Sequence, residues 1–271
     1  MDSELGILTL GLYVVSFILY ASLLYSNHRL LGLGATGSLA AALAVHYVTL
    51  YQRAVEVNAV PYHDLYGSMS LFAWLLVATY LGLEGFHRQR SVGPFVIPFA
   101  IVFYLVAMWL EPETPARIPD ARGPLFALHI TLNVLAYAAF GISFVLSTIY
   151  LLQNRFLRER RLGTVFWRFP ALEVLERMSR SGVIVGLCAL VVGMSLGSMW
   201  SKRLHGHYFT GDAKEIASLV ILLCYLAYVW LARDARWRGA RAAMLCIASF
   251  VLVIFSYTVV NLFLSGYHRY L

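Results

Sequence analysis

The sequence predicts an all-α protein, a polytopic membrane protein whose eight helices each cross a lipid bilayer. The chain is 60% hydrophobic and only 13% charged, whereas soluble domains carry about 25% charged residues. Apolar runs of about 17 to 25 residues, the length that spans a membrane, occur eight times. Lys and Arg are concentrated in alternate loops, as the positive-inside rule expects.

The eight apolar runs follow one another with only short polar connections. They cover residues 5–25, 31–51, 66–86, 94–110, 125–152, 182–200, 213–232 and 242–264. No linker rich in Pro or Ser separates them, so we expect a single membrane domain over residues 1–271. The first run follows the acidic segment 1–4 and is longer than a signal-peptide core, so we expect it to be retained.

The loop charges predict the orientation of the chain. Fourteen of the 21 Lys and Arg residues follow runs one, three, five and seven, and seven lie on the opposite side. The richer side is expected to be cytoplasmic, which places both termini and the loop 201–212 on the outer, periplasmic side. The net charge of +7 therefore reflects topology in a bacterial inner membrane, and no nucleic-acid partner is expected.

Cysteine usage excludes two classes of function. Cys188, Cys224 and Cys246 each lie inside an apolar run, and the chain contains neither C-x-x-C nor C-x-x-C-H. The chain is therefore neither a covalent c-type cytochrome nor a thiol–disulfide enzyme. Buried free cysteines behave as small hydrophobic residues.

The longest cytoplasmic connection, residues 153–181, has an amphipathic pattern in its second half. Pro170 suits the first position of a helix, and Glu173 with Arg177 forms a favourable i,i+4 pair. Three apolar side chains share one face: Leu172, Leu175 and Met178. This pattern predicts a short helix on the inner leaflet, and a basic connector without a partner explains it equally well.

Six of the eight histidines lie towards the outer side of the predicted bundle. They are His46, His63, His129, His205, His207 and His268. Imidazole is a common axial ligand of haem iron, and two histidines on separate helices can hold one iron from both faces. His129 and His268 lie at outer helix ends and suit that role. A histidine at the interface can instead bond to water or to a backbone carbonyl.

The loop 201–212 joins runs six and seven and is unusually rich in aromatic and metal-binding side chains. We expect it to face a flat, aromatic, metal-bearing ligand at the membrane surface. The candidate contacts are Trp200, Lys202, Arg203, His205, His207, Tyr208, Phe209 and Asp212. A capping box explains Asp212 and Glu215 without a ligand, and interfacial aromatics are also common in membrane proteins.

Several motifs give the sequence a resemblance to the CcsA/CcmC/CcmF family of haem-handling membrane proteins. The family has an outer motif W-G-x-Y-W-x-W-D-P-K-E, and the matching stretch here is residues 205–215, H-G-H-Y-F-T-G-D-A-K-E. Segments around His129 and His268 are similar to the family's two flanking-histidine helices. Residues 64–74 are similar to its N-L-Y-E-S segment, with Gly67 in place of the glutamate. The motif's tryptophans are replaced by His205, Phe209 and Gly211, so the porphyrin platform is reduced.

The resemblance implies a haem-handling role in the biogenesis of c-type cytochromes. Non-covalent, b-type haem would be held by His129 and His268 and presented to apocytochrome c, usually with a second membrane subunit as part of a cytochrome c synthase. Lys202 and Arg203 would pair with the haem propionates, with Tyr208 and Phe209 against the ring. His46 and His63 would form a second or transit site, although His46 could equally make a structural hydrogen bond.

Two other classes of function remain open on the sequence. The segment that starts at Pro170 is similar to HemX/YpjD-type relatives, so an accessory or scaffold protein of tetrapyrrole metabolism without stable haem is the alternative. A secondary transporter is disfavoured, because no internal repeat and no pair of broken spans is present.

Overall fold

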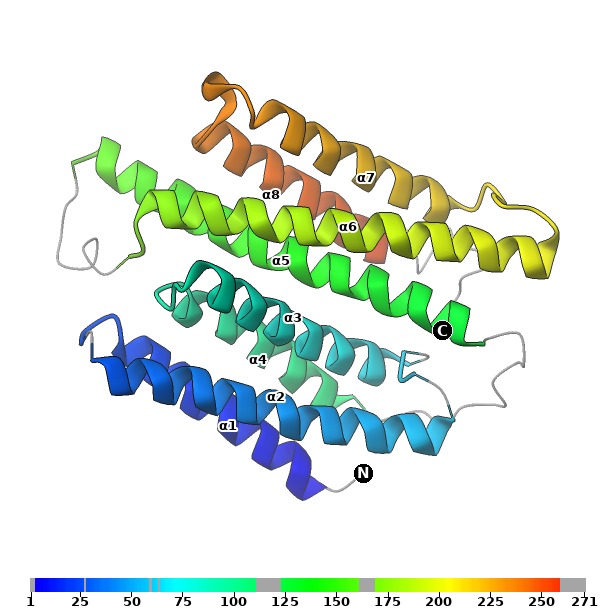
Figure 1. The fold of residues 1–271 in the computed structure, drawn as a ribbon, viewed down its shortest axis with the longest axis horizontal. Coiled ribbons are helices and arrows are strands. Elements are labelled where there is room, and N and C mark those ends of the chain that lie inside the picture. The colour runs from blue at the N-terminus through cyan, green and yellow to red at the C-terminus, as the bar shows by residue number, and fades with distance from the viewer. Residues whose placement is uncertain are drawn as a thin grey trace.

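The computed structural model describes residues 3–26, 28–58, 60–62, 64–110, 123–160 and 169–258, except for the side chains of Ser3 and His205. These ranges fold into eight α-helices and one short 3-10 turn, η2, and contain no strand (Figure 1). The helices are α1 (Ser3–Ser22), α2 (Arg29–Val57), α3 (Leu65–His87), α4 (Gly93–Trp109), α5 (Pro124–Arg158), α6 (Leu172–His205), α7 (Ala213–Leu231) and α8 (Ala240–Phe255), with η2 at Ala235–Trp237.

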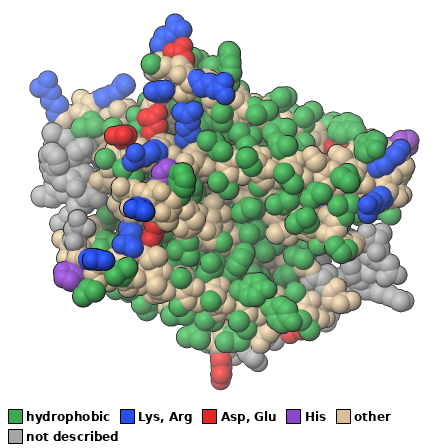
Figure 2. Space-filling model, in the orientation of Figure 1, with side chains coloured by type: hydrophobic (Ala, Val, Ile, Leu, Met, Phe, Trp, Pro, Cys, Tyr) green, Lys and Arg blue, Asp and Glu red, His purple; other side chains and the backbone are tan. Residues whose placement is uncertain are grey.

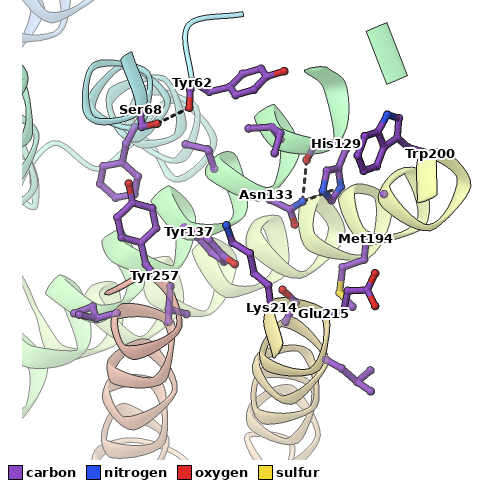
Figure 3. Close-up of a pocket in the computed structure, with 18 of the residues that line it drawn as sticks. Tyr62, Ser68, His129, Asn133, Tyr137, Met194, Trp200, Lys214, Glu215 and Tyr257 are labelled. Atoms are coloured by element: carbon purple, nitrogen blue, oxygen red, sulfur yellow. Dashed lines mark hydrogen bonds between the residues drawn. The ribbon is translucent and has the colours of Figure 1, made fainter. Parts of the chain in front are cut away.

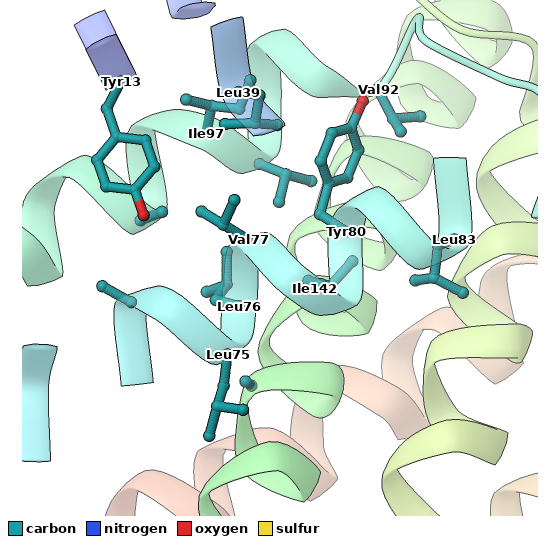
Figure 4. Packing of buried hydrophobic residues seen from close by; sticks show 14 of the residues in the cluster. Tyr13, Leu39, Leu75, Leu76, Val77, Tyr80, Leu83, Val92, Ile97 and Ile142 are labelled. Carbon is teal, nitrogen blue, oxygen red and sulfur yellow. The ribbon is translucent and has the colours of Figure 1, made fainter. Parts of the chain in front are cut away.

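The helices form two halves that meet along α3 and α5. Helices α1 to α4 pack on one another in the first half, and α5 packs against both α6 and α8 in the second. Figure 1 shows α3 and α4 between the α1–α2 pair and the α5–α6 pair. The core of the first half continues across the junction, because Ile142 of α5 packs with Leu76 and Tyr80 of α3 (Figure 4).

The structure supports a multi-pass membrane protein. Seven helices are long and apolar enough to cross a bilayer, and α4, with 17 residues, is shorter. The space-filling view shows a broad apolar surface, with most Lys and Arg side chains at one end and a smaller group at the other (Figure 2). Eight helices were predicted and eight are found in the described ranges. The number that cross the membrane and the side each terminus faces stay predictions.

The predicted surface helix in the connector 153–181 is wrong. Helix α5 continues to Arg158, and Leu172 begins α6, which runs without a break to His205. The expected apolar face is present, but Leu175 and Met178 are fully buried against the first half of the protein. The Glu173–Arg177 pair is found, at 3.9 Å. This amphipathic face therefore packs on protein rather than on lipid.

The connection between α6 and α7 is also shorter than predicted. Helix α6 extends five residues past Trp200, so Lys202 and Arg203 lie on its last turn. It ends at Gly206, which has a φ of +80°, a left-handed conformation that glycine adopts without strain. Nothing in the preceding residues breaks a helix, and the irregular part of the loop is confined to 206–212.

Candidate functional site

A cavity of about 800 Å³ lies where the two halves meet, at the end of the molecule where α6 ends and α7 begins. Its size falls within the range of small-molecule and cofactor sites, roughly 300 to 1,000 Å³. Side chains from α3, α4, α5, α6, α7 and α8 line it, and most of them are apolar (Figure 3). The cavity has room for a large, flat, mainly hydrophobic molecule.

Aromatic side chains build two parts of the cavity wall. On one side Phe72 of α3 packs against Phe103 of α4, with ring centroids 4.5 Å apart. On the other side Trp200 of α6 packs against Phe126 of α5, also with a centroid distance of 4.5 Å. Tyr62 also packs edge-on against Phe126, with ring centroids 5.7 Å apart. Trp200 is therefore held in place by its neighbours and offers a fixed aromatic surface.

His129 of α5 is the histidine that the described structure places in the cavity wall. Its Nδ1 lies 2.6 Å from the carbonyl oxygen of Gly193 on α6 and 3.1 Å from Nδ2 of Asn133. A carbonyl oxygen only accepts, so the shorter contact requires a proton on Nδ1. The Asn133 amide donates to the backbone carbonyl of His129 instead, at 2.9 Å. This tautomer leaves Nε2 as the nitrogen with a lone pair.

Two glycines on α6 make room for the imidazole. Gly193 supplies the carbonyl, and Gly197, one turn later, lies directly against the ring. A Cβ built on Gly197 would overlap Cε1 and lie 2.6 Å from Nδ1 of His129. Small residues four apart let two membrane helices approach closely. The ring position is therefore determined by α6 as well as by α5.

Hydrogen bonds within the loop 206–212 hold it to both flanking helices. Ser201 donates to the carbonyl of His207 at 3.0 Å. Asp212 is the N-cap of α7, as predicted, and accepts from the amide of Lys214 at 2.8 Å, the second residue of the helix. Glu215 accepts from the amides of Thr210 and Gly211, which lie two residues and one residue before the cap amide that a capping box uses. These hydrogen bonds therefore fix the loop between the end of α6 and the start of α7.

The structure distributes the predicted site residues over three groups. Trp200, Phe209 and His129 line the cavity. The second group lies outside its wall: Lys202, Arg203, His207, Tyr208, Asp212 and His46. His63, His268 and the side chain of His205 are outside the described residues.

Lys202 and Tyr208 do not have the positions expected of a haem platform. The Lys202 ammonium donates to the carbonyl of Gly206 at 2.7 Å and lies 5.2 Å from the centre of the Tyr208 ring. Tyr208 itself is 62% exposed. Lys202 and Tyr208 therefore pack together on the solvent-exposed surface at the end of α6. The lysine that lines the cavity is Lys214.

His46 is fully buried in the first half of the protein, away from the cavity wall. Its Nδ1 lies 2.8 Å from the Tyr13 hydroxyl and its Nε2 lies 2.9 Å from the Ser70 hydroxyl. Both ring nitrogens therefore have partners on neighbouring helices. This geometry agrees with a structural hydrogen-bonding role for His46, the alternative to a ligand role that the sequence analysis gave.

Several wall residues were not anticipated from the sequence. Asn133 follows His129 by four residues and shares its helix face, and Gly193 and Gly197 form a G-x-x-x-G pair inside the sixth apolar run. That spacing is a known signal for close helix packing. Lys214 matches the family motif at its tenth position, but no spacing rule indicated that it would reach the cavity.

Comparison with known proteins identifies the family. The sequence profile of the family described as "Cytochrome C assembly protein" matches residues 62–268. Protein HemX of Brevibacillus brevis is 27% identical over 92% of both chains. Cytochrome c biogenesis protein CcsA of Microcystis aeruginosa is 27% identical over 96% of this chain and 94% of its own. CcsA of Synechococcus sp. is 27% identical over 100% of this chain and 98% of its own. With its helical membrane architecture and this match over most of its length, the chain belongs to the cytochrome c assembly protein family.

Proposed function

We propose that this protein binds haem in the cavity between its two halves and presents it to apocytochrome c during the biogenesis of c-type cytochromes. His129 is one axial ligand, through Nε2, and His268 is the second. The cavity lies at the outer face of a bacterial inner membrane in this proposal. A second cytochrome-maturation membrane subunit completes the machinery that attaches the haem.

The observation that carries the proposal is the geometry of His129. Histidines that ligate metals usually donate their other ring N–H to a carbonyl or carboxylate, which fixes the tautomer and the ring orientation. Here the carbonyl oxygen of Gly193, 2.6 Å from Nδ1, provides that partner. The ring lies in the wall of an apolar cavity of about 800 Å³, a suitable environment for a porphyrin.

The donor set also fits haem better than a bare metal ion. Within the part of the chain that the structure describes, no three His, Cys, Asp or Glu side chains come close enough to hold a metal. A porphyrin supplies four nitrogens of its own and needs only axial ligands from the protein. Trp200 and Phe209 line the same cavity and offer aromatic surface to the ring. When bound, haem is the group to be transferred, and the protein's part is to orient it and shield it from water.

One specific observation keeps a second function in view. The chain is 27% identical to a protein named HemX over nearly its full length, and the family's tryptophans are largely absent from residues 205–215. An accessory or scaffold protein of tetrapyrrole metabolism, without stable haem, is therefore the second candidate. Whether the purified protein binds haem distinguishes the two functions.

The test is the optical spectrum of the detergent-purified protein after titration with haem. Wild type is compared with His129→Ala and His268→Ala, and His207→Ala serves as control because that side chain is exposed and outside the cavity wall. A reduced low-spin spectrum in wild type and control, lost or converted to high spin in the other two variants, supports the axial pair. A wild-type protein that stays colourless and takes up no added haem refutes the proposal and favours the accessory role.

A further inference from the structure

The cavity is apolar over most of its wall and polar at one end, beside the start of α7. Lys214 lies on the first turn of α7 and contributes to the wall. Figure 3 shows its side chain extending from α7 into the space between the helices, towards Tyr137 and Asn133 of α5. An amine in the wall of a mainly apolar cavity favours a ligand with negative charge at that end.

A second polar group marks the same end of the cavity. Thr210 lines the wall, and its hydroxyl oxygen is buried with no hydrogen-bond partner among the described residues. A buried hydroxyl without a partner costs free energy unless a ligand or water satisfies it. The N-terminus of α7 adds partial positive charge beside both residues. A carboxylate at this position would accept from Thr210 and from Lys214.

The acidic groups around Lys214 do not exclude such a ligand. Asp212 lies outside the cavity wall and caps α7 by accepting from the backbone amide of Lys214. Glu215 lines the wall, and its Oε2 accepts from the amides of Thr210 and Gly211. An ammonium has three donors, so a contact of Lys214 with another protein group does not prevent it from donating to a ligand.

We propose that Thr210 and Lys214 form the anion-binding end of this cavity, which selects a flat apolar ligand that carries a free carboxylate. The inference rests on the proposed function and specifies its ligand class, a porphyrin with unmodified propionates. It moves the predicted propionate contacts from Lys202 and Arg203, on the outer surface of α6, to the inside of the cavity.

The test compares two metal-free porphyrins, which need no axial histidine: protoporphyrin IX and its dimethyl ester. Binding is measured by fluorescence with the full-length protein in nanodiscs. We expect wild type to bind the diacid at least about tenfold more tightly than the diester, the ratio expected from a single charge-assisted hydrogen bond. Lys214→Met removes the contact between the charge and the carboxylate, so it should reduce that ratio to within about twofold. Lys214→Arg keeps the positive charge, so it should retain part of the preference.

Lys202→Met is the matched control, because it removes the same charge from the neighbouring helix end, outside the cavity wall. It should keep the wild-type preference for the diacid. Each variant is first checked for an unchanged size-exclusion profile. Equal binding of diacid and diester by wild type, or an unchanged preference in Lys214→Met, overturns this inference but leaves haem binding by His129 standing. If wild type binds neither porphyrin nor haem, the proposed function fails and this inference fails with it.

Discussion

Gly197→Ala should displace His129 and thereby weaken haem binding. The new Cβ would lie 2.6 Å from Nδ1 of His129 and closer still to Cε1, separations that no packed carbon reaches. The imidazole cannot simply turn aside, because Nδ1 donates to the Gly193 carbonyl at 2.6 Å. Either that bond breaks or α5 and α6 move apart.

The magnitude follows from three contributions. Overpacking a well-packed contact costs about 1–3 kcal/mol, and the lost hydrogen bond costs about 0.5–1.5 kcal/mol. Replacing glycine by alanine in a helix returns roughly 0.5–1 kcal/mol. We therefore expect a net loss of about 1–3 kcal/mol in unfolding free energy. Haem affinity should fall about 10- to 100-fold, as is typical when the partner of a ligating histidine is disturbed.

The assay is haem titration with thermal unfolding in detergent, on wild type, Gly197→Ala and Gly85→Ala. Gly85 is the control, because a Cβ there meets nothing within 4 Å. The double variant His129→Ala/Gly197→Ala removes the overlap, so it should be more stable than the sum of the single effects predicts. Unchanged haem affinity in Gly197→Ala, or strictly additive stabilities in the double variant, would refute the reasoning.

Three further predictions follow from the same contacts. His46→Ala should lower thermal stability and leave the haem spectrum unchanged, because Nδ1 of His46 bonds to Tyr13 and Nε2 bonds to Ser70. A change in the spectrum would support the second haem site that the sequence suggested. Asp64→Ala should lower the unfolding free energy, measured by thermal unfolding, by about 3–5 kcal/mol, because Asp64 pairs with buried Arg53 at 3.0 Å and caps α3. Glu56 also pairs with Arg53, but its side chain is 47% exposed. Glu56→Ala should therefore cost at most about 1 kcal/mol in the same assay. Hydrogen exchange followed by mass spectrometry should be faster over residues 213–220 of α7 than over residues 221–231, because the buried residues of this helix, Ile221, Tyr225 and Tyr228, all lie in the later stretch. Uniform protection along α7 would contradict this.

The number and order of the helices were predictable because the signal for a membrane helix is compositional. A run of about 20 apolar residues has few alternatives to a spanning helix, and α1, α3, α7 and α8 begin within two residues of the predicted positions. The errors occur where polar residues extend a helix beyond the apolar layer. Helices α5 and α6 both continue past the predicted ends of their apolar runs, through Arg155 and Arg158 in α5 and through Lys202 in α6. These polar residues are compatible with a helix in water, and α6 ends only at Gly206.

The partner of an apolar face could not be predicted from the sequence. Leu175 and Met178 belong to an amphipathic pattern that is typical of a surface helix. Lipid tails and a protein core are both apolar, so the pattern does not show which of them the apolar face contacts. The structure buries both against the first half of the protein. The same limit applies to charges: Lys202 and Lys214 lie at opposite ends of one short connection, and only the packing of α6 and α7 decides which one reaches the cavity.

The family profile matches residues 62–268 and so begins after α1 and α2, yet these two helices are joined to α3 by buried polar contacts at three levels. Glu84 of α3 accepts from Tyr20 and from Thr36, His46 bonds to Ser70, and Arg53 pairs with Asp64. Buried polar contacts between membrane helices each add only about 0.6 kcal/mol on average, so their main effect is to fix how the helices align. The first two turns of α3 supply Ser68, Met69 and Phe72 to the cavity wall. The first two helices therefore hold α3 in register against α5, and these contacts give the polar residues named here partners on neighbouring helices.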